Sequence, residues 1–377
     1  MNIVPGVPFL RAARRAVVVF GVGAVGAALC SAAVGAASSP PSEAPVATAT
    51  PVSQPARTLS AAEHAAVDHL RRAATAEATA TYSGTKWVTG HAAGGGVTVV
   101  EVRHAPARGT WLRVRTPVDR GAAAAQTVVD PAGAELDGEA LAALSHHYTL
   151  AVGRTERCSG RLATVVEARA LDTKRVAGRF WLDDETGLLL RRELYDAAGQ
   201  MVRGTVFVSL DTGDQATPAP AGATVVANRH VGTTLEVPDV AQLRRDGWHL
   251  PDQLPGGMER YSAMEMTVDG HRVVQLAYSD GIYAASVFVQ RGGLDPRSLR
   301  GFTRGRMAGA TVYTGTGLHR TVVWESSTEL YTLVLDGPEP LAADVVAAMP
   351  HTPVDNGFVA RLSRGIQRVG SWANPFE

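Results

Sequence analysis

Few residues of this chain have the types and spacing that covalent chemistry requires. The segment Ala277-Tyr-Ser279-Asp-Gly281 comes within one residue of the G-x-S-x-G elbow that exposes a nucleophilic serine. That elbow must join a strand to a helix, so that the hydroxyl lies over an oxyanion hole. Here strand-like sequence follows from Ala284 onward. We therefore interpret residues 279–281 as a hairpin turn, and a hydrolase that uses Ser279 is the third of three hypotheses.

The histidines and paired carboxylates do not form a recognisable catalytic or metal site. His64 and His69 are five residues apart on a predicted helix and so face different directions, and no H-E-x-x-H motif occurs. The acidic run Asp183-Asp184-Glu185 falls on a predicted tight turn, where we expect a solvated hairpin tip. We therefore predict a non-enzymatic protein with no catalytic residue, no metal site and no cofactor.

A glycine-rich motif near the N-terminus has the pattern of a dinucleotide fingerprint. Gly21-Val-Gly23-Ala-Val-Gly26 follows an apolar stretch, as a G-x-G-x-x-G loop would. The fingerprint needs a βαβ unit, whereas the chain runs next into the Pro-, Ala-, Ser- and Thr-rich residues 38–58. We interpret the glycines as part of an apolar export segment.

This N-terminal segment also predicts where the protein resides. Arg11, Arg14 and Arg15 precede an uncharged apolar run over residues 16–37. Because positive charge stays on the cytoplasmic side, the chain after residue 38 is expected to be extracytoplasmic. Residues 1–37 are either a cleaved signal peptide or a retained membrane anchor, so the protein is expected in the periplasm or cell-wall space, secreted or anchored to the outer face of the membrane. Residues 38–58 would be a disordered tether.

Composition limits the remaining possibilities. The 377 residues contain 36 Lys+Arg and 36 Asp+Glu, a balance that argues against a general nucleic-acid binder. Two cysteines exclude a disulfide-dense scaffold, and 45% apolar residues exclude full disorder. The length predicts two to three domains.

Two regions of regular periodicity define the expected folded part. Ser60-x-x-Glu63 is a capping box that opens a helix to about residue 78, and from residue 81 the apolar period changes to two. We predict a first domain over 59–212, built of this helix and a long antiparallel meander. A linker over 213–224 leads to a second domain over 225–350, with helices near 239–245 and 340–349 and an antiparallel sheet. The fold class is α+β.

The tail over 351–377 predicts a basic amphipathic helix. Its apolar and arginine side chains fall on opposite sides at helical spacing. Such a helix either contacts a membrane or partner surface or folds back on its own domain. The candidate surface residues are Phe358, Arg361, Leu362, Arg364, Ile366, Arg368 and Trp372.

The order of motifs along the exported part resembles the MucB/RseB family of extracytoplasmic regulators of anti-sigma factors. The segments that carry the resemblance are Tyr82-Ser-Gly84, Ala177-Gly-Arg-Phe-Trp-Leu-Asp183 with Thr186-Gly-Leu-Leu-Leu-Arg191, Trp248-His-Leu250 with Leu254-Pro-Gly-Gly257, and Tyr278-Ser-Asp-Gly281 with Ser286-Val-Phe-Val289. The match covers about residues 61–350. Each motif is only moderately specific, and their order is the stronger indication.

The resemblance implies both a fold and a function. The first domain would be a curved antiparallel half-barrel wrapped around helices, similar to the LolA/LppX lipoprotein carriers, and the second a smaller sheet-and-helix domain. The family binds an anti-sigma factor ectodomain and modulates envelope-stress signalling, and a lipid-like signal can relieve this binding. The tether and the basic tail depart from the family pattern.

An apolar cavity, if present, is expected to be lined by large side chains of the first domain, each of which could equally fill its core. The candidates are Tyr82, Trp87, Trp111, Phe180, Trp181 and Leu188. The second hypothesis for function is an extracytoplasmic lipid or lipoprotein carrier, with possible contact to a membrane surface. No nucleic-acid partner is expected.

Overall fold

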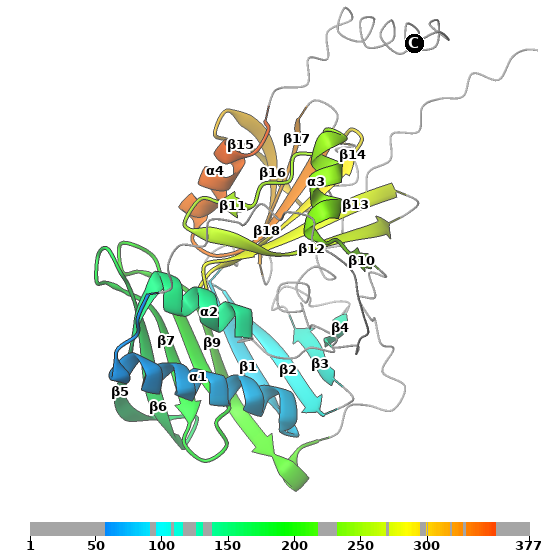
Figure 1. Cartoon of the computed structure of the whole chain (residues 1–377). Helices are drawn as coiled ribbons and strands as arrows, with labels where there is room; N and C mark the ends of the chain where they lie inside the picture. The colour runs from blue at the N-terminus through cyan, green and yellow to red at the C-terminus, as the bar shows by residue number, and fades with distance from the viewer. Residues whose placement is uncertain are drawn as a thin grey trace, which may run out of the picture.

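The computed structural model places two antiparallel sheets one after the other along the chain, each with its own helices (Figure 1). The described residues are 57–90, 96–106, 109–115, 126–130, 138–217, 232–268, 271–294, 299, 301–316, 319–326 and 329–351. The predicted export segment, almost the whole tether and all seven tail candidates lie outside them. None of the helices within these ranges is both long enough and apolar enough to span a bilayer.

The first helix begins where the capping box predicts. Ser60 is the N-cap of α1 (Ala61–Thr79), its side chain accepts a hydrogen bond from the Glu63 backbone, and the Glu63 carboxylate accepts one from the Ser60 backbone N–H at 2.9 Å. Arg57 forms an ion pair with Glu63 at 2.7 Å and donates to the backbone oxygen of Tyr148 at 3.0 Å. The start of α1 is therefore fixed both by its own cap and by a link to the first sheet.

Within the described residues the first sheet has nine strands in the order β4-β3-β2-β1-β9-β8-β7-β6-β5. The elements are β1 (Tyr82–Thr89), β2 (Val97–Ala105), β3 (Gly109–Arg115), β4 (Gln126–Asp130), α2 (Gly138–His147), β5 (Tyr148–Cys158), β6 (Arg161–Ala170), β7 (Val176–Asp183), β8 (Leu189–Tyr195) and β9 (Met201–Thr212). The predicted meander is confirmed, but the sheet becomes continuous only through the distant pair β1 and β9.

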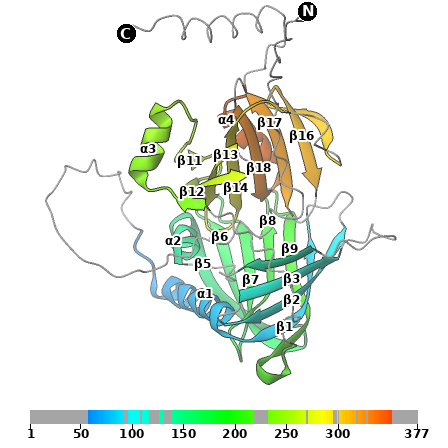
Figure 2. The ribbon, with the colours of Figure 1, turned by 90° about the vertical axis from the view of Figure 1, so that its right-hand side faces the viewer.

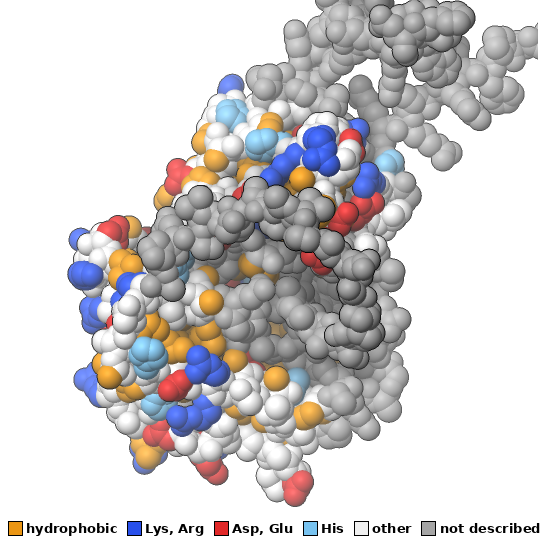
Figure 3. Space-filling view, viewed as in Figure 1, with side chains coloured by type: hydrophobic (Ala, Val, Ile, Leu, Met, Phe, Trp, Pro, Cys, Tyr) orange, Lys and Arg blue, Asp and Glu red, His pale blue; other side chains and the backbone are white. Residues whose placement is uncertain are grey.

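The helices α1 and α2 lie against one face of this sheet (Figure 1), which we call the inner face. Leu70 of α1, Leu144 of α2 and Phe180 of β7 are fully buried there in one apolar cluster. Figure 3 shows charged and histidine side chains over the opposite, solvent-facing side of α1. The amphipathic pattern of the helix thus determines which of its sides packs on the sheet.

The hairpin between β7 and β8 forms as predicted, with Gly187 at φ +80°. The expectation of a solvated tip was wrong for Asp183, which is buried, although Asp184 and Glu185 are exposed. Arg161 donates to both Asp183 carboxylate oxygens, at 3.0 and 2.9 Å, and Thr186 also donates to this carboxylate. These donors outweigh the effect of burial, which by itself would raise the pKa of Asp183, and they hold that pKa below its usual value of 3.8.

Asp183 should therefore contribute to stability in a pH-dependent way. A carboxyl whose pKa is lowered by folding stabilises the native state above its unfolded pKa, and this contribution disappears as pH falls through the lower native pKa. We expect Asp183→Asn to lower the free energy of unfolding by about 2 kcal/mol at pH 7, and by progressively less below about pH 4. Urea unfolding of both proteins from pH 7 to pH 3 measures this. Asp184→Asn, at the exposed neighbouring position, is the control and should change little at any pH.

The second sheet also has nine strands within the described part of the chain, all antiparallel. Its elements are β10 (Gly232–Thr234), α3 (Val237–Arg245), β11 (Gln253–Leu254), β12 (Met258–Val268), β13 (His271–Ser279), β14 (Ala284–Arg291), β15 (Thr303–Met307), β16 (Ala310–Thr316), β17 (Arg320–Ser326), β18 (Glu329–Asp336) and α4 (Glu339–Ala348). Both predicted helices are present, and the α+β class is confirmed.

The second unit has an independent apolar core. Trp324 and Tyr331 are fully buried and stack with ring centroids 5.3 Å apart. Val345 and Val346 of α4 close the same cluster, and α3 contributes Leu243. Figure 2 shows the second sheet beyond the end of the first, so the two units meet end to end.

Candidate functional site

The six predicted cavity residues do not converge on one surface. Tyr82, Phe180 and Leu188 are buried in the apolar clusters of the inner face. Phe180 and Trp181 are neighbours on β7 and therefore point to opposite faces of the sheet. Trp181 belongs to a separate cluster with Cys158 and Leu190, on the outer face.

The three tryptophans among these six candidates lie on the outer face, the side of the first sheet opposite to α1 and α2. Trp87 is 47% exposed, although it is one of the largest apolar side chains of the first sheet. Trp111 is buried beneath the guanidinium of Arg103, which lies 4.9 Å from the ring centre. Trp181 donates from its indole N–H to Glu156 at 2.9 Å. Only Tyr82, Phe180 and Leu188 are therefore placed where an inner apolar ligand could meet them.

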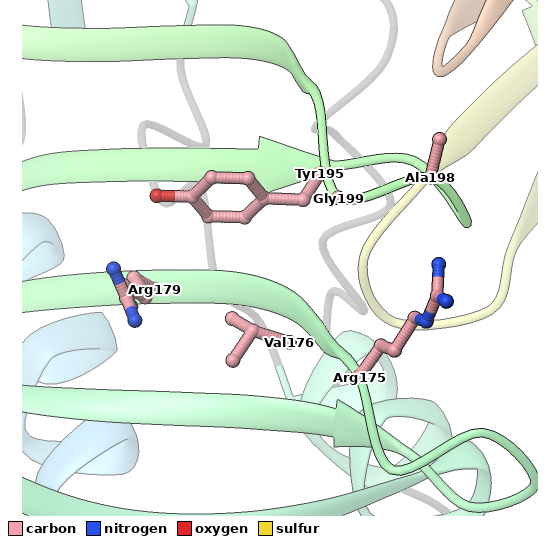
Figure 4. Close-up of a pocket in the computed structure, with 6 residues that line it drawn as sticks. All are labelled: Arg175, Val176, Arg179, Tyr195, Ala198 and Gly199. Carbon is pink, nitrogen blue, oxygen red and sulfur yellow. The ribbon is translucent and has the colours of Figure 1, made fainter.

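The outer face also holds a hollow of about 430 Å³ near the β6–β7 and β8–β9 turns (Figure 4). Figure 4 shows Arg179 and the Tyr195 ring on neighbouring strands, with Val176 on the floor and Arg175 near the turn of Ala198 and Gly199. We call these six residues the arginine pocket; they are Arg175, Val176, Arg179, Tyr195, Ala198 and Gly199.

The two guanidiniums of the arginine pocket differ in their partners. Arg179 donates to Glu167 at 2.8 Å and lies 5.8 Å from the Tyr195 ring centre, so its charge is partly compensated. Arg175 donates to the backbone oxygen of Ala197, and among the described residues no carboxylate forms an ion pair with it. Burial and the hydrogen bond to Glu193 raise the pKa of Tyr195 to about 12, so its hydroxyl stays protonated. This arrangement can bind a carboxylate or phosphate through Arg175.

The sequence contains a signal for the arginine pocket, although none of its six residues is among the predicted site residues. Arg175 and Arg179 are four positions apart at the start of a predicted strand, where strict alternation would place them on one face, although a register shift between β6 and β7 interrupts that alternation in the structure. The return strand brings Tyr195 to the same face after the hairpin. Composition alone does not distinguish these residues from the many other arginines of the chain.

Ser279 is the last residue of β13 and not part of the turn itself, but its hydroxyl bonds into the hairpin turn that was predicted to follow. Its hydroxyl donates to the backbone oxygen of Tyr283 at 3.0 Å and accepts from the Gly281 N–H at 2.9 Å. A strand and not a helix follows at Ala284. Both hydrogen-bonding roles of the hydroxyl are thus used within the turn. Within the described ranges, no group of three or more His, Cys, Asp or Glu side chains could hold a metal ion.

Comparisons with known proteins agree on one family. Residues 121–225 match the family described as MucB/RseB N-terminal domain. The sigma-E factor regulatory protein RseB of Escherichia coli K12 is 28% identical over 152 residues, which cover 39% of this chain and 46% of that protein. RseB of Shigella flexneri matches to the same extent. The alignment thus spans less than half the length of these curated relatives.

Solved structures that match this chain include MucB proteins. MucB in complex with MucA(peri) is 21% identical, with a TM-score of 0.45, over 77% of this chain and 100% of that one. The MucA/MucB complex of Pseudomonas aeruginosa is 23% identical, with a TM-score of 0.43, over the same shares of both chains. The match of residues 121–225, together with the RseB relatives, confirms the resemblance found in the sequence: this part of the chain is similar to the N-terminal domain of the MucB/RseB family.

Proposed function

We propose that this protein is a non-catalytic extracytoplasmic regulator that binds the ectodomain of an anti-sigma factor and thereby modulates envelope-stress sigma-factor signalling. The observation that carries the proposal is the MucB/RseB domain over residues 121–225, whose curated relatives are named sigma-E factor regulatory proteins. Because a fold can serve several functions, the partner must be tested directly. The use of Ser279 within its own turn is consistent with a binding role.

The direct test is a binding measurement between the purified exported chain and the soluble ectodomains of the single-pass anti-sigma factors of the same organism. Isothermal titration calorimetry should give one-to-one binding to at least one ectodomain, with a dissociation constant in the micromolar range or below, as specific regulatory contacts usually have. The absence of binding to every such ectodomain would overturn the proposal.

The arginine pocket is our candidate contact for an acidic side chain of this partner. Reversing the charge of Arg175 should weaken binding about tenfold, because a carboxylate that met the guanidinium would then meet another carboxylate. The variant Arg175→Glu tests this by calorimetry at low and high salt. Arg154→Glu is the matched control, since Arg154 is also exposed on the outer face but pairs with Glu156 at 2.8 Å. Equal losses in both variants would show a general charge effect and not a pocket contact.

A lipid or lipoprotein carrier is the second candidate function, and it has one structural argument. The layer between α1 and the first sheet contains a large apolar cluster, which includes Phe180 and Ala177. An acyl chain would have to enter this layer near Tyr82, Phe180 and Leu188. Mass spectrometry of organic extracts distinguishes the two functions, because a carrier should retain acyl lipid in stoichiometric amount and a pure regulator should not.

A further inference from the structure

The turn between β13 and β14 belongs to the second unit by sequence but packs into the first. Its residues 280–283 lie next to α2 and the end of β8, where Figure 1 shows the yellow turn reaching toward α2. Asp280 and Ile282 are 2% and 1% exposed, which is unusual for the tip of a hairpin. The tip of this turn is therefore packed against protein and is not exposed to solvent.

Asp280 makes one of the polar contacts between the two units. The hydroxyl of Tyr148, the first residue of β5, donates to the Asp280 carboxylate at 2.6 Å. The backbone N–H groups of Ile282 and Tyr283 donate to the other carboxylate oxygen at 2.8 and 2.7 Å. Burial raises the pKa of Asp280 against the opposing effect of these donors. A buried carboxyl group is costly unless its hydrogen-bonding partners are present, and one partner of Asp280, the Tyr148 hydroxyl, lies on the first unit.

Ile282 and Gly281 make the apolar and steric contacts. Ile282 is a member of the inner-face cluster of the first unit, together with Leu70 and Phe180. Gly281 has φ +95°, and a Cβ atom there would lie 2.2 Å from the backbone nitrogen of Leu144. The backbone of the turn thus touches the backbone of α2, and only glycine permits this approach.

Further bonds surround the turn. Arg192 donates to the backbone oxygen of Ile282 at 2.7 Å, and the Tyr283 hydroxyl donates to the backbone oxygen of Tyr195. Arg203 of β9 forms a buried ion pair with Asp336 of β18 at 2.7 Å. Tyr195 also lines the arginine pocket, so the pocket wall is bonded directly to the turn.

We propose that the β13–β14 turn, which we call the latch, can dock on the first unit and withdraw from it. In the docked state Ile282 completes the apolar core of the first unit, and the turn joins the two units. In the withdrawn state the two units separate and the apolar cluster of the inner face is uncovered. Three contacts hold the latch on the first unit: Asp280 accepts from the Tyr148 hydroxyl, Gly281 lies against α2, and Ile282 packs in the apolar cluster. It goes beyond the proposed function, because it describes this chain whether or not an anti-sigma factor binds.

Hydrogen exchange of the full exported chain tests the latch, because local opening raises exchange in the segments that open together. In Tyr148→Phe, which removes the hydroxyl but keeps the ring, exchange should become roughly tenfold faster both in residues 141–150 and in residues 278–286. Ile282→Ala removes the apolar anchor without touching the Tyr148 bond, and it should raise exchange in the same two segments.

Tyr331→Phe is the matched control. Its hydroxyl also donates to a buried carboxylate, that of Glu329, but this bond lies within the second unit. It should raise exchange in β17 and β18 and leave residues 141–150 unchanged. The proposal is contradicted if Tyr148→Phe accelerates hydrogen exchange in residues 141–150 alone, if it changes exchange in neither segment, or if exchange rises uniformly over the chain.

Discussion

Replacing Gly281 with alanine is expected to destabilise the protein by about 3 kcal/mol or more, one of the largest effects of any single methyl group in this chain. The added Cβ would lie 2.2 Å from the nitrogen and 2.4 Å from the Cα of Leu144, both backbone atoms that no rotamer change can move. The residue must also keep φ near +95°, which alanine disfavours. Urea unfolding measures the loss.

Gly199→Ala separates the two causes. Gly199 also has a positive φ, +80°, but a Cβ atom there would have no neighbour within 4 Å. This variant should therefore lose only the conformational part, about 1 kcal/mol. Equal losses at Gly199 and Gly281 would mean that contact with α2 contributes nothing and that the turn is not tightly docked.

Breaking the buried ion pair between Arg203 and Asp336 is expected to have the second large effect. Their side chains are only 9% and 11% exposed, so removal of one partner leaves a charge poorly solvated between the two units. Asp336→Asn or Arg203→Met alone should lower the free energy of unfolding by about 3 kcal/mol. The double variant should lose less than the sum of the two, because neither charge then remains.

The control for this cycle is the exposed pair Arg71 and Asp68 of α1, in which both side chains are 63% exposed. Neutralising either residue should change stability by less than about 1 kcal/mol, because solvent already screens both charges. A coupling energy for Arg203 and Asp336 as small as that of this exposed pair would contradict a close contact between the units in solution.

The two large predictions share a structural cause. Gly281 and the Arg203–Asp336 pair lie on the same boundary, at the turn that docks on α2 and at the ends of β9 and β18. Both therefore test whether the two sheets behave as one unit. If they do, thermal unfolding should be a single transition in the unmodified protein and should split in the variants.

Local signals were sufficient for the elements themselves. The Ser60–Glu63 capping box placed the start of α1, and Gly187 marked the β7–β8 hairpin with its positive φ. Even the separation of Phe180 and Trp181 onto opposite faces follows from the period of two in a strand. The resemblance to the MucB/RseB family also rested on motif order in the sequence.

Short sequence patterns could not predict whether the residues of a hairpin turn are buried by distant parts of the chain. Asp183 and Asp280 both occur in hairpin sequences typical of exposed tips, yet both are buried. Their carboxylates accept hydrogen bonds from Arg161 and Tyr148, which lie 22 and 132 residues away in the chain. The pairing of β1 with β9 and the docking of Ile282 in the first unit are likewise contacts between distant segments.

The amino-acid sequence by itself determined the helices, the hairpins and the α+β class, because these depend on periodicity, caps and turn residues within short windows. The order of its motifs also showed the resemblance to the MucB/RseB family. Only the tertiary structure decided which carboxylates are buried, which aromatic residues of different strands share a face, and how the two sheets are joined. The physical reason is that burial and ion pairing depend on neighbours brought together by the whole fold, which no short window of sequence contains.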